Sequence, residues 1–328
     1  MEEMKKKRWG YFLSKYMLVF ILLALIIALS FAAEHFMNLG NIMTILRNSA
    51  MQGIVAFGMT MVIIAGEIDL SVASQIAFSG CLAAVLVREL TEVGMAMGLA
   101  IGIAMVVCIV IAYLIGMFIA MMRSRLGVPT FITTLALMTA LAGAALLITD
   151  GFPVTSFPQE FSFLGAGFIG GFFPFPAIIL LVVFFVVFFV LKYTKFGREV
   201  YAVGGNVEAA RLNGVNINRV RSIIFGVTQA LSALSGLIVA SQINSGNPQV
   251  AKGWEMNIIS AVIIGGASLS GGKGSAIGTL IGVLFLGVVL NGMTQLNVNT
   301  YWQQVVQGVL VLLAVLLNTL SARGQRQS

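Results

Sequence analysis

KYTKFGREVYAVGGNVEAARLNGVNINRVR, residues Lys192–Arg221, separates two long apolar segments of this chain. It holds six basic residues against two acidic ones, and short loops rich in Lys and Arg lie on the cytoplasmic side of membrane proteins. A simple connection needs only a few residues. We therefore expect a cytoplasmic surface for a soluble partner, with a helix around Val207–Leu212 and closing glycines at Gly204–Gly205 and Gly214.

The composition places the rest of the chain in a membrane. Hydrophobic residues make up 59% of the 328 residues, charged residues only 9%, and the mean hydropathy is +1.01. A soluble domain carries about 25% charged residues. The sequence predicts an all-α polytopic membrane protein with a single transmembrane domain over residues 1–328. The net charge of +7 is interpreted as a topology signal and as contacts with the lipid bilayer, with no nucleic-acid partner.

Ten apolar segments have the length, or nearly the length, needed to cross a bilayer, which takes about 20 residues. If the N-terminus lies inside and the chain alternates, sixteen of the nineteen Lys and Arg residues fall on the inner side. A miscounted span would scatter them over both faces. The sequence thus predicts about ten transmembrane helices with both termini cytoplasmic, in the segments Tyr16–Ala33, Ala50–Ala65, Leu70–Val87, Val93–Met122, Pro129–Thr149, Phe175–Leu191, Ser222–Ile243, Met256–Leu269, Ser275–Met293 and Tyr301–Leu320.

Two carboxylates interrupt the apolar pattern between the second and third segments, in Gly66-Glu67-Ile68-Asp69-Leu70-Ser71. Carboxylates near membrane depth are costly and usually face a water-filled cavity or a partner. Two interpretations stay open: Glu67 and Asp69 line a solute path or brace the helix break, or Asp69 caps the third span by accepting backbone N–H bonds. The further candidates for the path are hydrogen-bonding residues, which could instead join helices: Ser71, Gln75, Asn291 and Gln295.

Two distant stretches of the chain show a weak internal sequence similarity. Val62-Ile63-Ile64-Ala65-Gly66 precedes Leu70-Ser71, and Val262-Ile263-Ile264-Gly265-Gly266 precedes Leu269-Ser270. In each, a short span ends in glycine, a polar break follows and a new span begins. Broken helices related by an internal repeat surround the substrate path in many transporters. Chance similarity between glycine-rich apolar stretches is the alternative.

The motifs of self-sufficient transport and of catalysis are missing. The closest approach to a phosphate-binding loop, Gly265–Gly274, has Lys273 but neither the spacing nor the following hydroxyl. Ion ligands at mid-membrane, which a secondary carrier needs, are not evident. Nor is a nucleophile–base pair or a metal-ligand cluster. We expect a transport subunit that is not an enzyme, has no catalytic residues, metal site or cofactor of its own, and borrows energy from a partner.

Four stretches of the chain match one family. Thr194–Arg221 closely resembles the cytoplasmic coupling loop of permeases in the ribose/xylose/arabinose/galactose ABC importer family. Gly58–Ser74 is similar to that family's Gly-x-x-Asp-Leu-Ser-Val-Gly-Ser stretch, and Gly265–Gly282 and Thr300–Asn318 continue the resemblance in order along the chain. The resemblance identifies the family with high specificity, but it does not identify the transported substrate.

Three positions depart from the family pattern. Glu67 stands where a second glycine is common, Ala73 replaces the glycine after Leu-Ser-Val, and Val207 separates an asparagine and a glutamate that usually adjoin. The first two put details of the substrate path in doubt. The third leaves the coupling loop intact in outline.

The resemblance implies a permease subunit of an ATP-driven importer for a monosaccharide or similar sugar, in the bacterial inner membrane. It implies a second copy of the chain, an ATPase subunit that binds ATP and Mg²⁺, and an extracytoplasmic sugar-binding protein. The alternatives are a related permease for branched-chain amino acids or nucleosides, and a secondary carrier. Within 192–221, coupling is expected at Gly205, Asn206, Glu208, Ala209, Ala210, Arg211 and Gly214, with residues 208–211 facing the ATPase.

Overall fold

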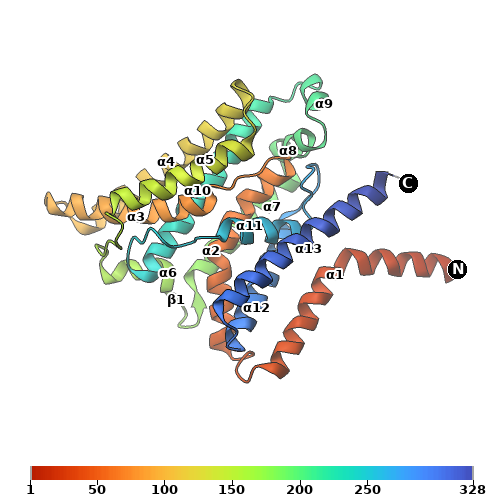
Figure 1. Cartoon of the computed structure of the whole chain (residues 1–328), viewed down its shortest axis with the longest axis horizontal. Helices are drawn as coiled ribbons and strands as arrows, with labels where there is room; N and C mark the ends of the chain where they lie inside the picture. The colour runs from red at the N-terminus through yellow and green to blue at the C-terminus, as the bar shows by residue number, and fades with distance from the viewer. Residues whose placement is uncertain (1, 327–328) are drawn as a thin grey trace.

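The computed structural model describes residues 2–326, with side chains described for residues 17–313, 315 and 316. Helices dominate it (Figure 1), and a two-stranded antiparallel hairpin is formed by β1 (Phe168–Ile169) and β2 (Phe173–Pro174). The helices are α1 (Glu2–Ala32), α2 (Leu39–Ile64), α3 (Val72–Glu92), α4 (Met97–Arg125), α5 (Thr130–Ile148), the 3-10 turn η1 (Gln159–Ser162), α6 (Phe163–Ala166), α7 (Phe175–Tyr193), α8 (Lys195–Gly205), α9 (Val207–Leu212), α10 (Ile217–Ile243), α11 (Trp254–Ile264), α12 (Ala276–Gln295) and α13 (Thr300–Arg326).

Helix α10 is the central helix of the fold, and it packs against α2, α3 and α4. Its close contacts depend on glycine. A Cβ atom at Gly116 of α4 would overlap the carbonyl of Phe225, and one at Gly236 of α10 would overlap the carbonyl of Ile76. Small residues of this kind let helix backbones approach each other in membrane proteins. As a result, α10 is buried along most of its length, and so is the half of α2 that leads to Ile64.

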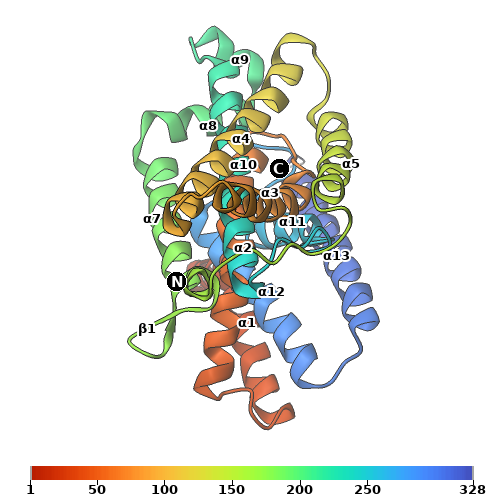
Figure 2. The ribbon, with the colours of Figure 1, turned by 90° about the vertical axis from the view of Figure 1, so that its left-hand side faces the viewer.

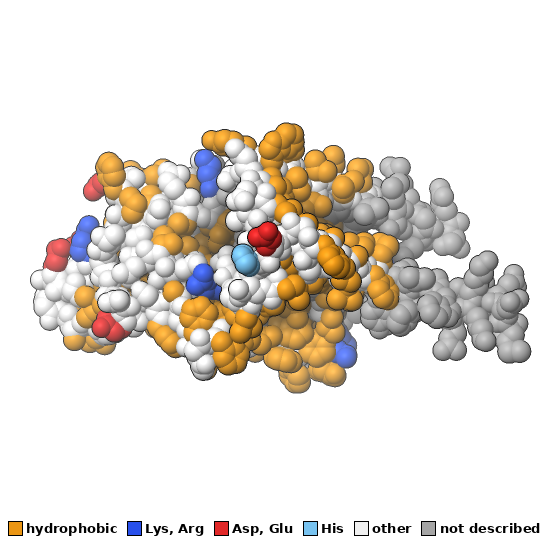
Figure 3. Space-filling view, turned by 90° about the horizontal axis from the view of Figure 1, so that it is seen from below, with side chains coloured by type: hydrophobic (Ala, Val, Ile, Leu, Met, Phe, Trp, Pro, Cys, Tyr) orange, Lys and Arg blue, Asp and Glu red, His pale blue; other side chains and the backbone are white. Residues whose placement is uncertain are grey.

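The outer helices turn apolar side chains away from the protein. Val106, Val110 and Leu114 on α4 are exposed, as are Val182 and Phe185 on α7. Figure 3 shows the face seen from below, where hydrophobic side chains alternate with uncharged polar surface and scattered charged side chains. Water would not tolerate so much apolar surface, whereas lipid chains cover it. The fold is therefore that of an all-α polytopic membrane protein.

Six helices among the described residues are both long and apolar enough to cross a bilayer: α3, α4, α5, α7, α10 and α12. The other four predicted segments also fall on helices, namely α1, α2, α11 and α13. Helix α2 begins at Leu39, eleven residues before the predicted start at Ala50, and this early part carries Arg47 and Asn48. Helix α11 has only 11 residues. The count of ten transmembrane helices therefore stays a prediction.

Helices α2 and α11 end in the same backbone geometry. Gly66 and Gly266 both have positive φ, +77° and +94°. The Glu67 N–H donates to the Val62 carbonyl at 3.1 Å, and the Ala267 N–H donates to the Val262 carbonyl at 3.1 Å. Each ending is a Schellman motif, in which a left-handed glycine closes the last turn. The two similar stretches of sequence thus share the same backbone structure. This favours an internal repeat over chance similarity.

Loops that the sequence predicts on the cytoplasmic side gather at one end of the molecule, which we call the inner end (residues 65–71, 123–130, 194–216 and 265–275). Helices α8 and α9 and the α4–α5 connection lie at the top of Figures 1 and 2. The Gly272 N–H donates to the Ile64 carbonyl, and the Tyr201 hydroxyl donates to the Gly274 carbonyl, both at 2.8 Å. The sequence also predicts that basic residues 5–8, 15, 323 and 326 lie on the inner side. Their side chains are outside the described residues.

The α5–α7 connection is folded against the opposite end, the outer end of the molecule. The Ser156 hydroxyl donates to the Ala84 carbonyl at 2.6 Å, and Val154 forms an isolated β-bridge with Gly246. The hydroxyl of Ser241 at the end of α10 donates to the Phe161 carbonyl. These bonds fix the connection to α3 and α10 on that side.

Candidate functional site

Glu67 is the centre of an ionic cluster at the inner end. Its Oε1 accepts from Arg123 Nε at 3.2 Å and from Arg221 Nη2 at 2.9 Å, and its Oε2 accepts from the Thr130 hydroxyl at 2.7 Å. Glu67 is 6% exposed, and Arg221 is also buried. The carboxylate therefore joins the α2–α3 break to the end of α4 and to the starts of α5 and α10.

Asp69 joins the same break to α10 through uncharged partners. Its Oδ1 accepts from the backbone N–H of Ser71 at 2.9 Å and from the Ser71 hydroxyl at 2.6 Å. Its Oδ2 accepts from Gln229 Nε2 at 2.7 Å, and the same amide donates to the Ser71 hydroxyl at 2.8 Å. Asp69 thus forms a turn with Ser71, the N-cap residue of α3, and braces the break against α10, whereas the first turn of α3 has no side-chain cap. The capping role of Asp69 stays a prediction.

The two other polar candidates on α3 are held inside the protein. Ser71 takes part in the Asp69 network, and Gln75 is fully buried, where its Nε2 donates to the Ser79 hydroxyl at 2.7 Å. The Gln75–Ser79 bond lies within α3, and the Gln75 Oε1 has no partner among the described residues. In this structure Glu67, Asp69, Ser71 and Gln75 lie in packed surroundings, so their predicted place on a solute path stays a prediction.

The predicted coupling stretch forms two short helices, and α9 has the bounds expected from the sequence. Asn206 caps α9 by accepting from the Ala209 N–H at 3.0 Å. Glu208 and Arg211 form an exposed ion pair at 3.0 Å. Gly214 has φ of +77° and closes the stretch. The caps explain why six residues hold a helical turn that would be unstable alone.

Helix α9 turns opposite faces toward the protein and the solvent. Ala209 and Arg211 are exposed, and Leu212 is 87% exposed. Ala210, in contrast, is 4% exposed and belongs to the main hydrophobic core. The expectation that all of residues 208–211 face outward is wrong for Ala210. Its methyl group is the apolar contact that seats the helix on the inner end.

Helix α8 connects this surface to the helix breaks. Its Gly204 lies so close to the Ile64 carbonyl that a Cβ atom would overlap it. Gly205, the last residue of α8, is exposed. Burial raises the pKa of the Tyr201 hydroxyl, so this group stays protonated and donates its bond to Gly274. A displacement of α8 would therefore act directly on the ends of α2 and on the 265–275 loop.

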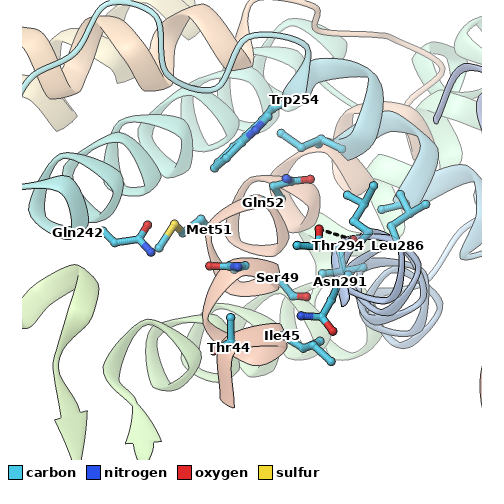
Figure 4. A pocket seen from close by; sticks show the side chains of 16 residues that line it. Thr44, Ile45, Ser49, Met51, Gln52, Gln242, Trp254, Leu286, Asn291 and Thr294 are labelled. Carbon is cyan, nitrogen blue, oxygen red and sulfur yellow. Dashed lines mark hydrogen bonds between the residues drawn. The ribbon is translucent and has the colours of Figure 1, made fainter. Parts of the chain in front are cut away.

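A cavity of about 420 Å³ lies toward the outer end, between α2, α10, α11 and α12 (Figure 4). It is lined by α2 from Thr44 onward and by α11 from its first residue, Trp254. The last turn of α10 and the part of α12 from Val283 onward complete it. None of its sixteen described lining residues is charged. They are Thr44, Ile45, Asn48, Ser49, Met51, Gln52, Gln242, Trp254, Ile258, Ala261, Val283, Leu286, Gly287, Leu290, Asn291 and Thr294.

Several polar groups of the cavity have no partner within the protein. Among the described residues, the side chains of Asn48, Gln52 and Gln242 make no hydrogen bond, although Asn48 and Gln52 lie one helical turn apart on α2. The hydroxyl of Ser49, a residue only 5% exposed, is also unpartnered. Figure 4 shows Gln52, Gln242 and Trp254 around one opening, on three different helices. The cavity therefore offers free hydrogen-bonding capacity.

The candidates Asn291 and Gln295 meet at the rim of the cavity. The amides of Asn41 and Asn291 exchange two hydrogen bonds, at 3.0 and 2.8 Å, and Gln295 Nε2 donates to Asn41 Oδ1 at 2.7 Å. Asn291 also lines the cavity, whereas Gln295 does not. The structure thus places the predicted path residues in two groups, four at the inner end and two at the outer cavity.

The sequence prediction missed the residues that complete both groups. Asn48 and Gln52 carry a detectable signal, because a four-residue spacing places both on one face of a helix. Trp254 and Gln242 lie at helix ends, where polar and aromatic residues are common. Their presence there does not by itself indicate a binding site. Arg123 and Arg221 were recognised only as inner-side charges. Their common partner Glu67 is far away in the sequence, so no local pattern indicates the pairing.

Comparisons with known proteins identify the family. The sequence profile described as "Branched-chain amino acid transport system / permease component" matches residues 41–315. The probable ABC transporter permease protein YphD of Escherichia coli is 45% identical over 305 residues, which cover 92% of this chain and 89% of the relative.

Several of the similar proteins are named for a sugar. The ribose import permease protein RbsC of Bacillus subtilis is 40% identical over 299 residues, 90% of each chain. The L-arabinose transport system permease protein AraH of Escherichia coli is 37% identical over 323 residues, 97% of this chain and 94% of the relative. No solved structure matches the chain. The chain belongs to the branched-chain amino acid transport system / permease component family.

Proposed function

We propose that this chain is the transmembrane permease subunit of an ATP-driven importer and that its solute is a monosaccharide or similar sugar. The observation that carries the sugar assignment is the cavity at the outer end, whose described lining is uncharged and rich in amides and hydroxyls. The relatives named for ribose and L-arabinose support the same solute class. A neutral, hydroxyl-rich solute can exchange its water for such groups without a charged partner.

The family description names branched-chain amino acids, which makes them the second candidate. An amino acid enters as a zwitterion, and each of its two charges needs a compensating charge or several donors when it leaves water. The described lining of the cavity supplies no charged side chain. The sugar is therefore the better match.

The proposed assembly has partners at both the inner and the outer end of the molecule. Residues 1–328 form one permease domain of about ten spans with both termini in the cytoplasm of a bacterium, and it pairs with a second copy of itself. A separate ATPase subunit binds ATP and Mg²⁺, and a sugar-binding protein delivers solute outside. The lack of a phosphate-binding loop in the sequence and the solvent-facing side of α9 support this division of labour.

Coupling to the ATPase is assigned to the stretch 192–221. The exposed residues Glu208, Ala209 and Arg211 form the docking face, and Leu212 adds an apolar side chain at the tip of α9. Asn206 caps the helix, Gly205 and Gly214 border it, and Ala210 anchors it. Motion of α9 passes through the short link 213–216 into α10, whose Arg221 and Gln229 bond to Glu67 and Asp69.

The solute path runs from the outer cavity, with Asn291 and Gln295 at its rim, toward the inner end. There Glu67, Asp69 and Ser71 join the helices, and Gln75 lies buried on α3. The test is uptake by cells that express the chain with its ATPase and binding protein. Labelled D-ribose or L-arabinose should accumulate in an ATP-dependent manner. Accumulation of labelled L-leucine, with neither sugar transported, would replace the sugar assignment by the amino-acid one.

A further inference from the structure

We propose that the outer cavity is a monosaccharide-binding subsite in which Trp254 stacks on one face of the sugar ring while Gln52 and Gln242 bind its hydroxyl groups. The sugar class of the ligand rests on the proposed function. The location of the subsite and the roles of the three residues rest on the geometry of the cavity.

The size and the position of the cavity suit a small solute. Its volume of about 420 Å³ lies in the range of roughly 300–1,000 Å³ that small-molecule pockets occupy. Ser49 in its wall lies fifteen residues before Ile64, which corresponds to about 22 Å along α2. The intervening part of α2 is buried in the core. The solute therefore meets this subsite in the outer half of the protein, before it reaches the inner end.

The hydrogen-bonding groups match those of a sugar. Each amide side chain has two N–H donors and a carbonyl acceptor, and a sugar hydroxyl both donates and accepts. Gln52 on α2 and Gln242 on α10 face one opening from two sides. Neither has a partner among the described residues. The free amide groups of these two side chains can therefore bind a polar molecule in the opening.

Trp254 supplies the apolar part of the site. It is the first residue of α11 and is half-buried at the cavity, where its indole N–H makes no hydrogen bond within the described residues. An indole combines a flat apolar face with one polar N–H. One face of a pyranose or furanose ring consists largely of C–H groups, which pack on such a surface while the hydroxyls point sideways to the amides.

The charge of the lining restricts the ligand further. Phosphate groups are bound by Arg, Lys or clustered backbone donors, and none of the sixteen described lining residues is basic. The subsite therefore takes an unmodified neutral sugar in preference to a sugar phosphate or an amino acid.

Tryptophan fluorescence tests the subsite directly, because the chain has only three tryptophans. Trp9→Phe and Trp302→Phe leave Trp254 as the sole emitter in the full-length chain, reconstituted in nanodiscs without the partner subunits. Titration with D-ribose or L-arabinose should change its emission in a saturable manner, and L-leucine should not. An emission unaffected by either sugar would overturn the subsite, even if cells accumulate the sugar. A response to L-leucine alone would overturn the proposed function as well.

Variants of the amides separate binding from folding. In the same background, Gln52→Ala should weaken sugar binding roughly tenfold, the effect expected for one lost hydrogen bond. The control is Gln249→Ala, because Gln249 is exposed and outside the described lining. Gln52→Asn keeps an amide and guards against a folding defect. Unchanged affinity in both Gln52 variants would remove Gln52 from the site.

The stacking role of Trp254 is tested in the complete importer. Trp254→Phe keeps an aromatic face, and Trp254→Leu keeps only apolar volume. Sugar uptake should fall strongly in Trp254→Leu and much less in Trp254→Phe, at equal amounts of complex in the membrane. Equal uptake in the two variants would show that the ring acts as general apolar surface and would refute stacking.

Discussion

The two ends of this permease use polar side chains in opposite ways. At the inner end, all four carboxylate oxygens of Glu67 and Asp69 accept bonds from residues of α4, α5, α10 or the α3 start. In the outer cavity, the amides of Asn48, Gln52 and Gln242 have no protein partner among the described residues. The two carboxylates are held by the protein and join its helices, whereas the three amides remain free to bind a ligand. The contrast teaches that packing in the same apolar chain leaves some polar groups structural and others receptive.

Removal of Glu67 should produce the largest effect on stability. Glu67→Leu leaves the buried guanidinium of Arg221 without its charge partner, and breaking a buried pair in this way costs about 3 kcal/mol or more. We expect a clear fall in the thermal unfolding temperature of the purified chain and poor yield. The matched control is Glu208→Leu, whose exposed pair with Arg211 contributes under about 1 kcal/mol. Equal stability of the two variants would contradict the structural role of the Glu67 cluster.

Two neighbouring residues of α9 should separate anchoring from docking. Ala210→Trp overpacks the buried side of α9 and should destabilise the inner end. Ala209→Trp lies on the exposed side, so the chain should insert and remain stable, but sugar should no longer stimulate the ATPase of the complex. Thermal stability of the chain and ATPase activity of the assembled importer are the two measurements. Wild-type stimulation in Ala209→Trp would place the docking face elsewhere.

Asp69 should show an intermediate effect that depends on the replacement. In Asp69→Asn, one oxygen can still accept from Ser71, and Gln229 can rotate its amide because its Oε1 has no partner. Complex yield should therefore stay close to wild type with a partial loss of sugar uptake. Asp69→Leu removes both acceptors and should abolish uptake almost completely. Uptake and complex yield are measured together, and full uptake in both variants would show that Asp69 is dispensable.

The smallest effect is expected at the rim of the outer cavity. Gln295→Ala removes one hydrogen bond to Asn41 at an exposed position, where a neutral bond contributes about 1 kcal/mol or less. Asn41 keeps its two bonds with Asn291. Thermal stability and uptake should both remain near wild type. A severe loss of uptake at normal stability would instead assign Gln295 a direct role in solute entry.

Local patterns in the sequence predict the helices and α9, but they cannot predict the contacts that close either end. The bounds of α9 were predictable because a capping asparagine and a glycine enclose it. The start of α2 was misplaced because Arg47 and Asn48 interrupt the apolar pattern, and Asn48 faces a cavity that only the assembled helices create. The burial of Ala210 could not be read from six residues, which are too few for a helical period.

The pairing of Glu67 with two arginines is likewise a property of the packed fold. Its departure from the family's common glycine marked the position as unusual, but the partners come from the end of α4 and the start of α10. The repeated helix endings at Gly66 and Gly266 were the one long-range feature visible in the sequence. They were visible because the two copies of the repeat have nearly the same amino acids.

Thiol labelling of one introduced cysteine tests the contrast between the two ends most directly. Cys81 and Cys108 are buried, so Gln52→Cys provides a reactive site in the cavity and Asn213→Cys one beside α9. In spheroplasts, a membrane-impermeant thiol reagent should label residue 52, more slowly when D-ribose or L-arabinose is present, and should leave residue 213 unlabelled until the membrane is opened. Labelling of residue 213 from outside, or labelling of residue 52 that neither sugar slows, would contradict an outer sugar cavity opposite a cytoplasmic coupling end.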